Sequence, residues 1–84
     1  MGTTKETIAA WFDDGVRMGA RWMVVACDTW DWEDHPIYVK STEDVHAVVS
    51  RLSAPSEMWS VMEVYSFERD KQAQLDADRA WNLD

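Results

Sequence analysis

Hydrophobic residues recur near the start of the chain at positions i, i+3, i+4, i+7, i+8 and i+11, which is the spacing of one face of an α-helix. The residues at these positions are Ile8, Trp11, Phe12, Gly15, Val16 and Gly19. Thr3 and Glu6 have the spacing of a capping box, which predicts that the helix begins there. Gly19 predicts its end, because glycine tolerates the left-handed conformation found just past many helices. We expect Gly15 to let a neighbouring element approach closely.

Three later segments have the composition of β-strands. Residues 21–28, RWMVVACD, carry apolar side chains at both odd and even positions, which predicts a strand that is covered on both faces. Residues 36–40, PIYVK, predict an edge strand beginning at Pro36, because proline lacks an N–H donor. The connection between these two strands is short and predicts an antiparallel hairpin. Residues 58–67 are rich in aromatic and β-branched residues and predict a third strand.

Two further helices are predicted. Ser41 or Thr42 would cap the first of them, with Glu43 and Asp44 in its positive first turn. Its buried stripe comprises Val45, Val48, Val49 and Leu52. Residues 68–82 predict a terminal helix whose apolar stripe is narrow and mostly alanine. We expect this helix to be the least stable element and to dock loosely.

The resulting order is α-β-β-α-β-α, which predicts a single small α+β domain over residues 1–84. The third strand has two possible positions. Beside the first strand it completes a three-stranded, mainly antiparallel sheet of order 2-1-3 packed with helices, whereas beside the second it forms a parallel pair through a right-handed crossover. The 2-1-3 order is favoured, because the first strand is apolar on both faces and belongs in the centre.

The chain carries 16 acidic and 8 basic residues, for a net charge of −8. This excess disfavours direct binding to nucleic acid or to an anionic membrane. It serves solubility, or it complements a protein partner with a basic surface. Cys27 is the only cysteine, so no intrachain disulfide forms. The longest apolar run, residues 22–27, is too short to span a bilayer, and we expect a cytoplasmic protein without a secretion signal.

Residues 27–36, CDTWDWEDHP, concentrate the candidate chemistry of the chain. Asp28, Asp31 and Glu33 are candidate ligands for a weakly bound hard cation such as Mg²⁺ or Ca²⁺. However, the glycine and the distal glutamate of a calcium loop are missing at the proper spacing. Zinc would require more cysteine and histidine ligands than the chain offers. We therefore expect no bound cofactor and treat these three residues as weak candidates only.

An acid–base site is a second interpretation of the same segment. Asp28 at a strand end and His35 across the hairpin would form the pair, with Asp31 and Glu33 nearby. No catalytic serine or cysteine arrangement and no glycine-rich phosphate loop accompanies them. A chain of 84 residues also leaves little room for a deep pocket. An enzyme is disfavoured, and the metal-assisted or acid–base site is kept as the alternative.

The two indoles in this segment favour a protein interaction instead. Trp30 and Trp32 either fold back over the sheet and cap the core, or they are exposed. Exposed aromatic side chains ringed by carboxylates make an effective hot spot for a protein partner. Our leading hypothesis is therefore a small acidic protein-interaction module. Its predicted contact residues are Trp30, Asp31, Trp32, Glu33, Asp34 and His35.

Residues 11–39 carry a recognisable pattern: an aromatic-Asp-x-Gly helix end, Gly-Ala, an apolar strand, Cys-Asp-Thr-aromatic-Asp, Glu-Asp and Pro-x-Tyr-Val. The pattern resembles a group of small uncharacterised proteins encoded by bacteriophages and some bacteria. It covers about a third of the chain and is most specific over residues 27–39. The resemblance implies a phage or prophage context but no particular chemistry. Because small acidic phage proteins often block host proteins, it favours a binder or inhibitor of a host or defence protein, acting in the host cytoplasm.

Two other functions stay open from the sequence. The chain would bind a nucleotide or another small anion only if basic side chains gathered within this acidic molecule. The candidates are Arg17, Arg21, Lys40 and Arg51. A homodimer would form if one sheet face carrying Trp59 or Tyr65 stayed uncovered by the helices.

Overall fold

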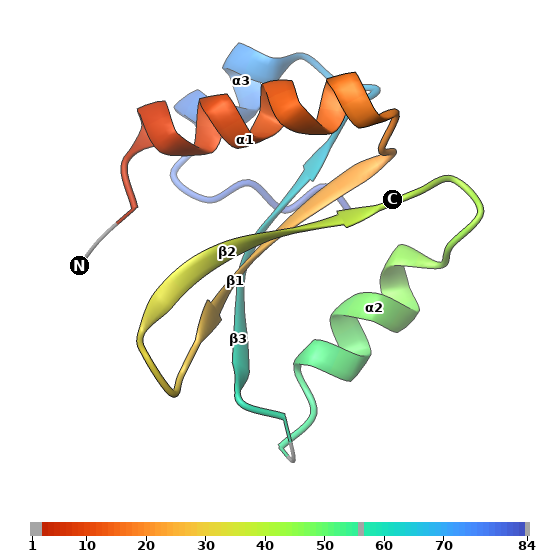
Figure 1. The fold of residues 1–84 in the computed structure, drawn as a ribbon. Helices are drawn as coiled ribbons and strands as arrows, with labels where there is room; N and C mark the ends of the chain where they lie inside the picture. Colours follow the sequence, from red (N-terminus) through yellow and green to blue (C-terminus); the bar gives the residue numbers. More distant parts are fainter. Residues whose placement is uncertain (1–2, 56, 84) are drawn as a thin grey trace.

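A computed structural model describes residues 3–55 and 57–83 of the chain. Three helices and three strands follow one another in the predicted order, α-β-β-α-β-α, and they form the expected small α+β domain (Figure 1). The elements are α1 (Lys5–Met18), β1 (Trp22–Asp28), β2 (Glu33–Val39), α2 (Val45–Leu52), β3 (Trp59–Ser66) and α3 (Lys71–Asp76).

The sheet has the order β2-β1-β3, and both neighbours of β1 run antiparallel to it. Met23 of β1 pairs with Tyr38 of β2 on one side and with Tyr65 of β3 on the other. The prediction of a central first strand is therefore confirmed. The prediction that the second strand begins at Pro36 is wrong, because pairing with β1 starts at Glu33. Proline is tolerated inside β2 because this strand is an edge of the sheet.

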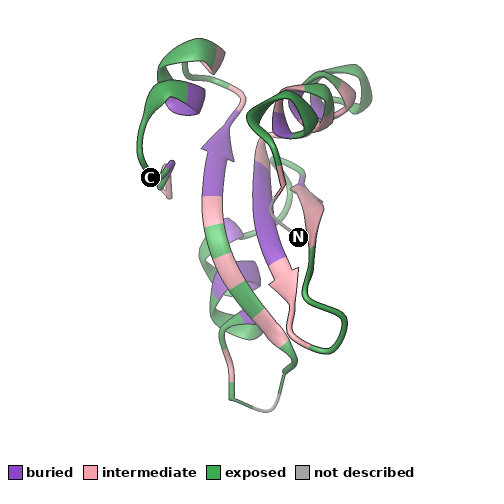
Figure 2. Cartoon of the chain, turned by 90° about the vertical axis from the view of Figure 1, so that its left-hand side faces the viewer, coloured by how far each residue is buried: buried purple, intermediate pink, exposed green. Residues whose placement is uncertain are grey.

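The sheet has a hydrophobic core on each face, since the side chains of β1 alternate between the two. Met23 and Val25 pack with residues of α1 and α3, whereas Val24 packs with the apolar stripe of α2. Figure 2 shows the buried part of the strands beside the helices and the exposed hairpin tip at the far end from α1. Tyr65, one of the two residues that would favour a homodimer if their sheet face were uncovered, is fully buried in the core beneath α1.

Helix α1 begins one residue later than the capping box predicts. Thr4, rather than Thr3, is the N-cap, and its side chain accepts a hydrogen bond from the backbone N–H of Thr7. The helix ends at Gly19, which has the predicted left-handed conformation with a φ of 75°. Gly15 is buried, and a methyl group added there would lie within 2.9 Å of Tyr38 Cε1, so the predicted close approach is confirmed.

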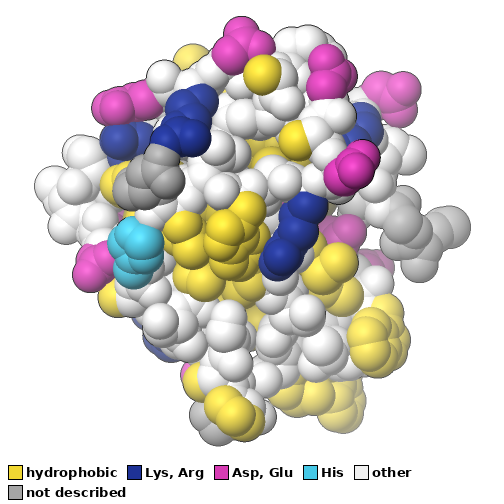
Figure 3. Space-filling view, turned by 180° about the vertical axis from the view of Figure 1, so that it is seen from behind, with side chains coloured by type: hydrophobic (Ala, Val, Ile, Leu, Met, Phe, Trp, Pro, Cys, Tyr) yellow, Lys and Arg dark blue, Asp and Glu magenta, His cyan; other side chains and the backbone are white. Residues whose placement is uncertain are grey.

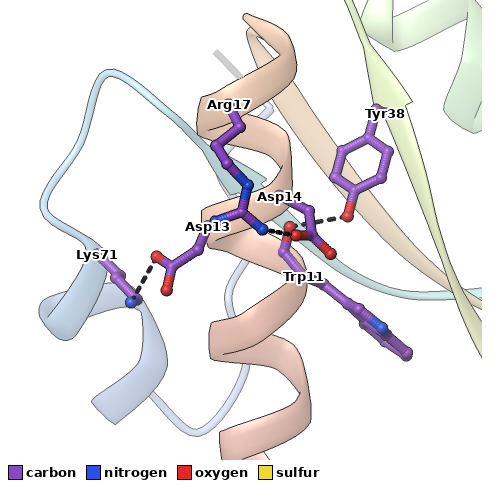
Figure 4. A network of polar contacts seen from close by, with 6 residues as sticks. All are labelled: Trp11, Asp13, Asp14, Arg17, Tyr38 and Lys71. Atoms are coloured by element: carbon purple, nitrogen blue, oxygen red, sulfur yellow. Dashed lines mark hydrogen bonds and ion pairs between the residues drawn. The ribbon is translucent and has the colours of Figure 1, made fainter.

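Polar contacts join α1 to its neighbours (Figure 4). The Tyr38 hydroxyl of β2 donates a hydrogen bond of 2.7 Å to the backbone carbonyl of Trp11. Lys71 of α3 forms an ion pair of 2.9 Å with Asp13 of α1. These contacts tie the helix to the edge strand on one side and to the C-terminal region on the other.

Helix α2 carries the predicted buried stripe, and all four of its residues are buried. Its N-terminus differs from the prediction, because Asp44 is the cap and neither Ser41 nor Thr42 is. The Asp44 carboxylate accepts hydrogen bonds from the N–H groups of His46 and Ala47. Asp44 therefore stands just outside the helix rather than within its first turn.

The prediction of a helix over residues 68–82 is wrong in extent, because α3 ends at Asp76. Ala77 is extended, and the chain then runs alongside β3 as a short parallel bridge between Val64 and Trp81. Val64 donates its N–H to the carbonyl of Ala80, and Asn82 donates its N–H to the carbonyl of Val64. Backbone pairing with the free edge of β3 is thus more stable here than a longer helix, whose apolar stripe would be mostly alanine.

Among the described residues, no helix combines the length and the apolar character needed to cross a lipid bilayer.

Candidate functional site

The segment that the sequence singled out forms the hairpin between β1 and β2. We call residues 28–34 the acidic tryptophan loop. The backbone carbonyl of Asp28 accepts a hydrogen bond of 2.7 Å from the N–H of Trp32, which closes the turn. The N–H of Thr29 donates to the carbonyl of Met58, 2.8 Å away, so the base of the loop is also held to the start of β3. These bonds give the loop a defined backbone.

Trp32 has a left-handed backbone with a φ of 59°. This conformation is uncommon for a residue other than glycine and costs free energy that the surrounding contacts must offset. Here the hydrogen bond to Asp28 and the pairing of the next residue, Glu33, with β1 hold it in place. The residue with this strained backbone therefore carries one of the two indole rings at the tip of the hairpin.

Both tryptophans of the loop point into solvent. The relative exposure is 77% for Trp30 and 68% for Trp32. Neither residue belongs to a hydrophobic core, so of the two orientations open from the sequence the structure has the exposed one. Exposed large apolar side chains occur elsewhere too, and Figure 3 shows several apolar groups on the rear face of the molecule. The others among the described residues are Val16, Met18, Met58, Met62 and Trp81.

The carboxylates of the loop flank these indoles in the sequence and form no ion pair with a lysine or arginine of the described residues. Asp31 and Glu33 are exposed, and Asp34 is half-buried. The ion pairs formed within residues 3–55 and 57–83 involve none of them. The tip of the hairpin thus combines two exposed aromatic rings with negative charge that the described part of the chain leaves uncompensated.

His35 lies at the base of the loop rather than at its tip. It pairs with Ala26 of β1, and its half-buried ring contacts the ring of Trp59 edge-on, with 5.8 Å between the ring centres. Ala26 is fully buried. Sequence reasoning missed Trp59 as a neighbour of the loop, although the 2-1-3 order places the start of β3 opposite the end of β1.

Three groups of the segment converge as possible metal ligands. One ligand atom each from Asp28, Asp31 and His35 lies within 4.8 Å of the others. The metal candidates named from the sequence were Asp28, Asp31 and Glu33, and the structure brings only the first two of these into the group. His35 takes the place of Glu33.

Cys27 lies on the opposite sheet face from this group, because side chains alternate along β1. Burial raises the pKa of its thiol, and the nearby carboxylates of Asp34, Asp31 and Asp28 raise it further. The thiol is therefore protonated at neutral pH and is a poor nucleophile. An acid–base pair of Asp28 and His35 is geometrically accessible, but neither residue lines either of the two cavities described next.

Two open cavities of about 380 and 370 Å³ lie on the surface, and of the loop residues only Asp34 lines one of them, the second. The first is formed by α3 and the C-terminal segment, and the second lies between the start of α1 and the sheet. None of the four basic residues proposed for nucleotide binding lines either cavity. Arg17 instead pairs with Asp14, and Arg21 pairs with Glu68 at 3.0 Å. The four basic residues named for nucleotide binding therefore do not converge on either of these cavities, whose basic lining residues are Lys5, Arg69 and Arg79.

Comparisons of the chain with protein-family models, with curated proteins and with solved structures find no match.

Proposed function

We propose that this protein is a small acidic interaction module, and that the acidic tryptophan loop binds a protein partner with a basic surface. The observation that carries the proposal is the exposure of Trp30 and Trp32 at the tip of a hairpin lined by unpaired carboxylates. In the phage context that the resemblance implies, the partner is a host or defence protein in the host cytoplasm. Binding would block that protein, which makes the module an inhibitor.

The exposed indoles supply the affinity in this proposal. Burying a large apolar side chain against a partner is worth about 1.5–3 kcal/mol. Tryptophan is also among the residues most often found to dominate binding energy. Because Trp30 and Trp32 keep 77% and 68% of their surface in water, most of this gain is available to an intermolecular contact.

The defined backbone of the loop lowers the cost of binding. Hydrogen bonds from Trp32 to Asp28 and from Thr29 to Met58 already order the hairpin in the free chain. A partner therefore does not have to order the backbone, and less conformational entropy is lost on association.

The carboxylates determine which kind of partner the loop favours. Asp31 and Glu33 flank the indoles and would attract a basic surface and repel an acidic one, which raises the association rate and the specificity. Two copies of this chain, each with a net charge of −8, repel one another. In addition, Tyr65 is buried, so one of the two residues that favoured a homodimer no longer does. The loop is better suited to a different, basic protein.

Affinity capture with loop variants tests the proposal. Tagged chain is used to capture a partner from a host lysate, and the affinity of the purified partner is then measured by calorimetry. If each indole contributes about 2 kcal/mol, each of Trp30→Ala and Trp32→Ala lowers the affinity about thirtyfold. Trp81→Ala is the matched control, because Trp81 is 43% exposed but belongs to the C-terminal segment.

The free energy of unfolding of the two loop variants should change by less than about 0.5 kcal/mol, because the rings make no core contacts. Partner affinity that is unchanged in the Trp30→Ala, Trp32→Ala double variant would refute the assignment to this loop. A loss in Trp81→Ala as large as in the loop variants would place the contact elsewhere.

A further inference from the structure

The geometry points to a binding site for one divalent transition-metal ion, formed by Asp28, Asp31 and His35. The three side chains come from the end of β1, from the loop and from β2, and their nearest ligand atoms all lie within 4.8 Å of one another. The site lies at the base of the hairpin, whereas the indoles proposed to bind a partner are exposed near its tip. It does not depend on any protein partner.

The pairing of β1 with β2 explains why Asp28 and His35 meet. Asp28 pairs with Glu33, and His35 pairs with Ala26. Residues two apart on a strand share a face, so Asp28 and His35 are diagonal neighbours on the same face of the sheet. The turn then brings Asp31 back toward them. A register shifted by one residue would separate the imidazole from both carboxylates.

The ligand atoms are held in place and are still available. One oxygen of Asp28 accepts a hydrogen bond of 2.9 Å from the N–H of Trp30, and one oxygen of Asp31 accepts a bond of 3.0 Å from the N–H of Glu33. These bonds orient each carboxylate and leave its second oxygen without a hydrogen-bond donor from the described residues. The ring nitrogens of His35 make no hydrogen bond to that part of the chain either, while the ring itself rests against Trp59.

The electrostatics of the group favour a cation. Asp28 and Asp31 place two carboxylates close together, and no lysine or arginine of the described residues forms an ion pair with either of them. The two carboxylates repel one another, and the net charge of −8 adds a negative potential that attracts a cation. A divalent ion between the two carboxylates replaces this repulsion with attraction.

The ligand set selects the type of ion. Imidazole suits Zn²⁺ and similar transition metals, whereas carboxylates suit Mn²⁺ as well as Ca²⁺ and Mg²⁺, so a set of one imidazole and two carboxylates fits Zn²⁺ or Mn²⁺. Metal–ligand bonds of about 2.1 Å place ligand atoms no more than about 4.2 Å apart. The present limit of 4.8 Å therefore requires only a small closing movement of the side chains. Three protein ligands leave the other coordination positions to water.

Calorimetric titration of the free chain with ZnCl₂ and with MnCl₂ tests the site. Asp31→Asn and His35→Gln should each lower the affinity at least tenfold. Glu33→Gln is the control for Asp31→Asn, because it removes the same charge from the same loop but lies outside the ligand group. His46→Gln is the control for His35→Gln, because His46 is the other histidine and lies on α2. Both controls should bind within twofold of the unaltered chain.

Amide NMR spectra of the unaltered chain with substoichiometric Mn²⁺ give a second readout that needs no variant. Signals of residues 28–35 and of Trp59 should broaden first, because the ion sits among them. Broadening spread evenly over the acidic surface would overturn the proposal, as would equal losses of affinity in Asp31→Asn and Glu33→Gln. Absence of binding at millimolar Zn²⁺ and Mn²⁺ would overturn it too. None of these outcomes bears on partner binding through Trp30 and Trp32.

Discussion

Gly15→Ala should destabilise the protein, although alanine is a better helix former than glycine. The new methyl group would contact Phe67 Cζ and would lie 2.9 Å from both Phe67 Cε1 and Tyr38 Cε1. These half-buried rings pack against the core and cannot withdraw as freely as an exposed side chain can. Overpacking of this kind costs about 1–3 kcal/mol. The gain in helix propensity is at most about 1 kcal/mol.

Because the new methyl group would lie 2.9 Å or less from three ring atoms, its cost belongs in the upper part of the overpacking range, about 2–3 kcal/mol, and the balance is a loss of about 1–2 kcal/mol in the free energy of unfolding. For a domain of this size, each kcal/mol lowers the thermal midpoint by roughly 4–8 °C. Denaturant unfolding and thermal melts measure both quantities. A Gly15→Ala chain that is as stable as the unaltered chain, or more stable, would refute the close approach of α1 to the sheet.

A double-mutant cycle separates the packing cost from backbone effects. Phe67→Leu removes the ring atoms nearest to the new methyl group, so Gly15→Ala should cost at least 0.5 kcal/mol less in that background, a coupling of about the size expected for residues in contact. Gly19→Ala is the control, because it places its methyl group in open space and costs only backbone strain at a φ of 75°. Its cost should be the same with either residue at position 67.

Two further predictions concern stability. Burial and the hydrogen bond to Glu63 raise the pKa of Tyr65 above its ordinary value of 10.0. The folded chain then holds the phenol proton more tightly than the unfolded chain does. The free energy of unfolding should therefore fall as the pH rises above about 10. In denaturant titrations, Tyr65→Phe should reduce this dependence on pH. Asp44→Ala should cost about 1 kcal/mol through loss of the helix cap, whereas Ser41→Ala and Thr42→Ala should cost less than about 0.5 kcal/mol. Equal slopes in the first case, or equal losses in the second, would contradict these assignments.

The central elements of the fold could be predicted because their patterns have one interpretation. The apolar side chains at both parities of residues 22–27 require cover on both faces, and this requirement places β1 in the centre of the sheet. The prediction for the C-terminal region was wrong because its sequence pattern had more than one interpretation. An alanine-rich stripe stabilises a helix only weakly. Residues 80–82 therefore form backbone hydrogen bonds with the free edge of β3 at Val64 instead.

The first residue of α2 was predicted less accurately than its buried face. The segment before α2 holds Ser41, Thr42 and Asp44, all of which are good capping residues. The sequence does not distinguish them, because the choice depends on where the chain leaving β2 reaches the core. The structure selects Asp44, since Val45 is the first residue of the helix and is buried at once.

The hairpin shows how strand geometry redistributes residues that crowd together in the sequence. Asp34 and His35 are adjacent along the chain but lie on opposite faces of β2, because side chains alternate along a strand. His35 therefore joins Asp28 and Trp59 at the base of the hairpin, and Asp34 joins Cys27 on the other face. Single-sequence reasoning grouped all six residues of the predicted contact set because it lacked this register.

Two surfaces with different chemistry result from one short segment. The indoles at the tip offer apolar area to a macromolecule, and the carboxylates and imidazole at the base offer ligands to a small cation. Asp31 belongs to both proposed sites, so Asp31→Asn should weaken both kinds of binding and cannot separate them. His35→Gln should affect only the proposed metal site, and the Trp30→Ala, Trp32→Ala double variant should affect only the proposed partner site. A chain that loses metal affinity with the first and partner affinity with the second has two independent sites, whereas loss of both properties in either variant would mean that the hairpin works as one.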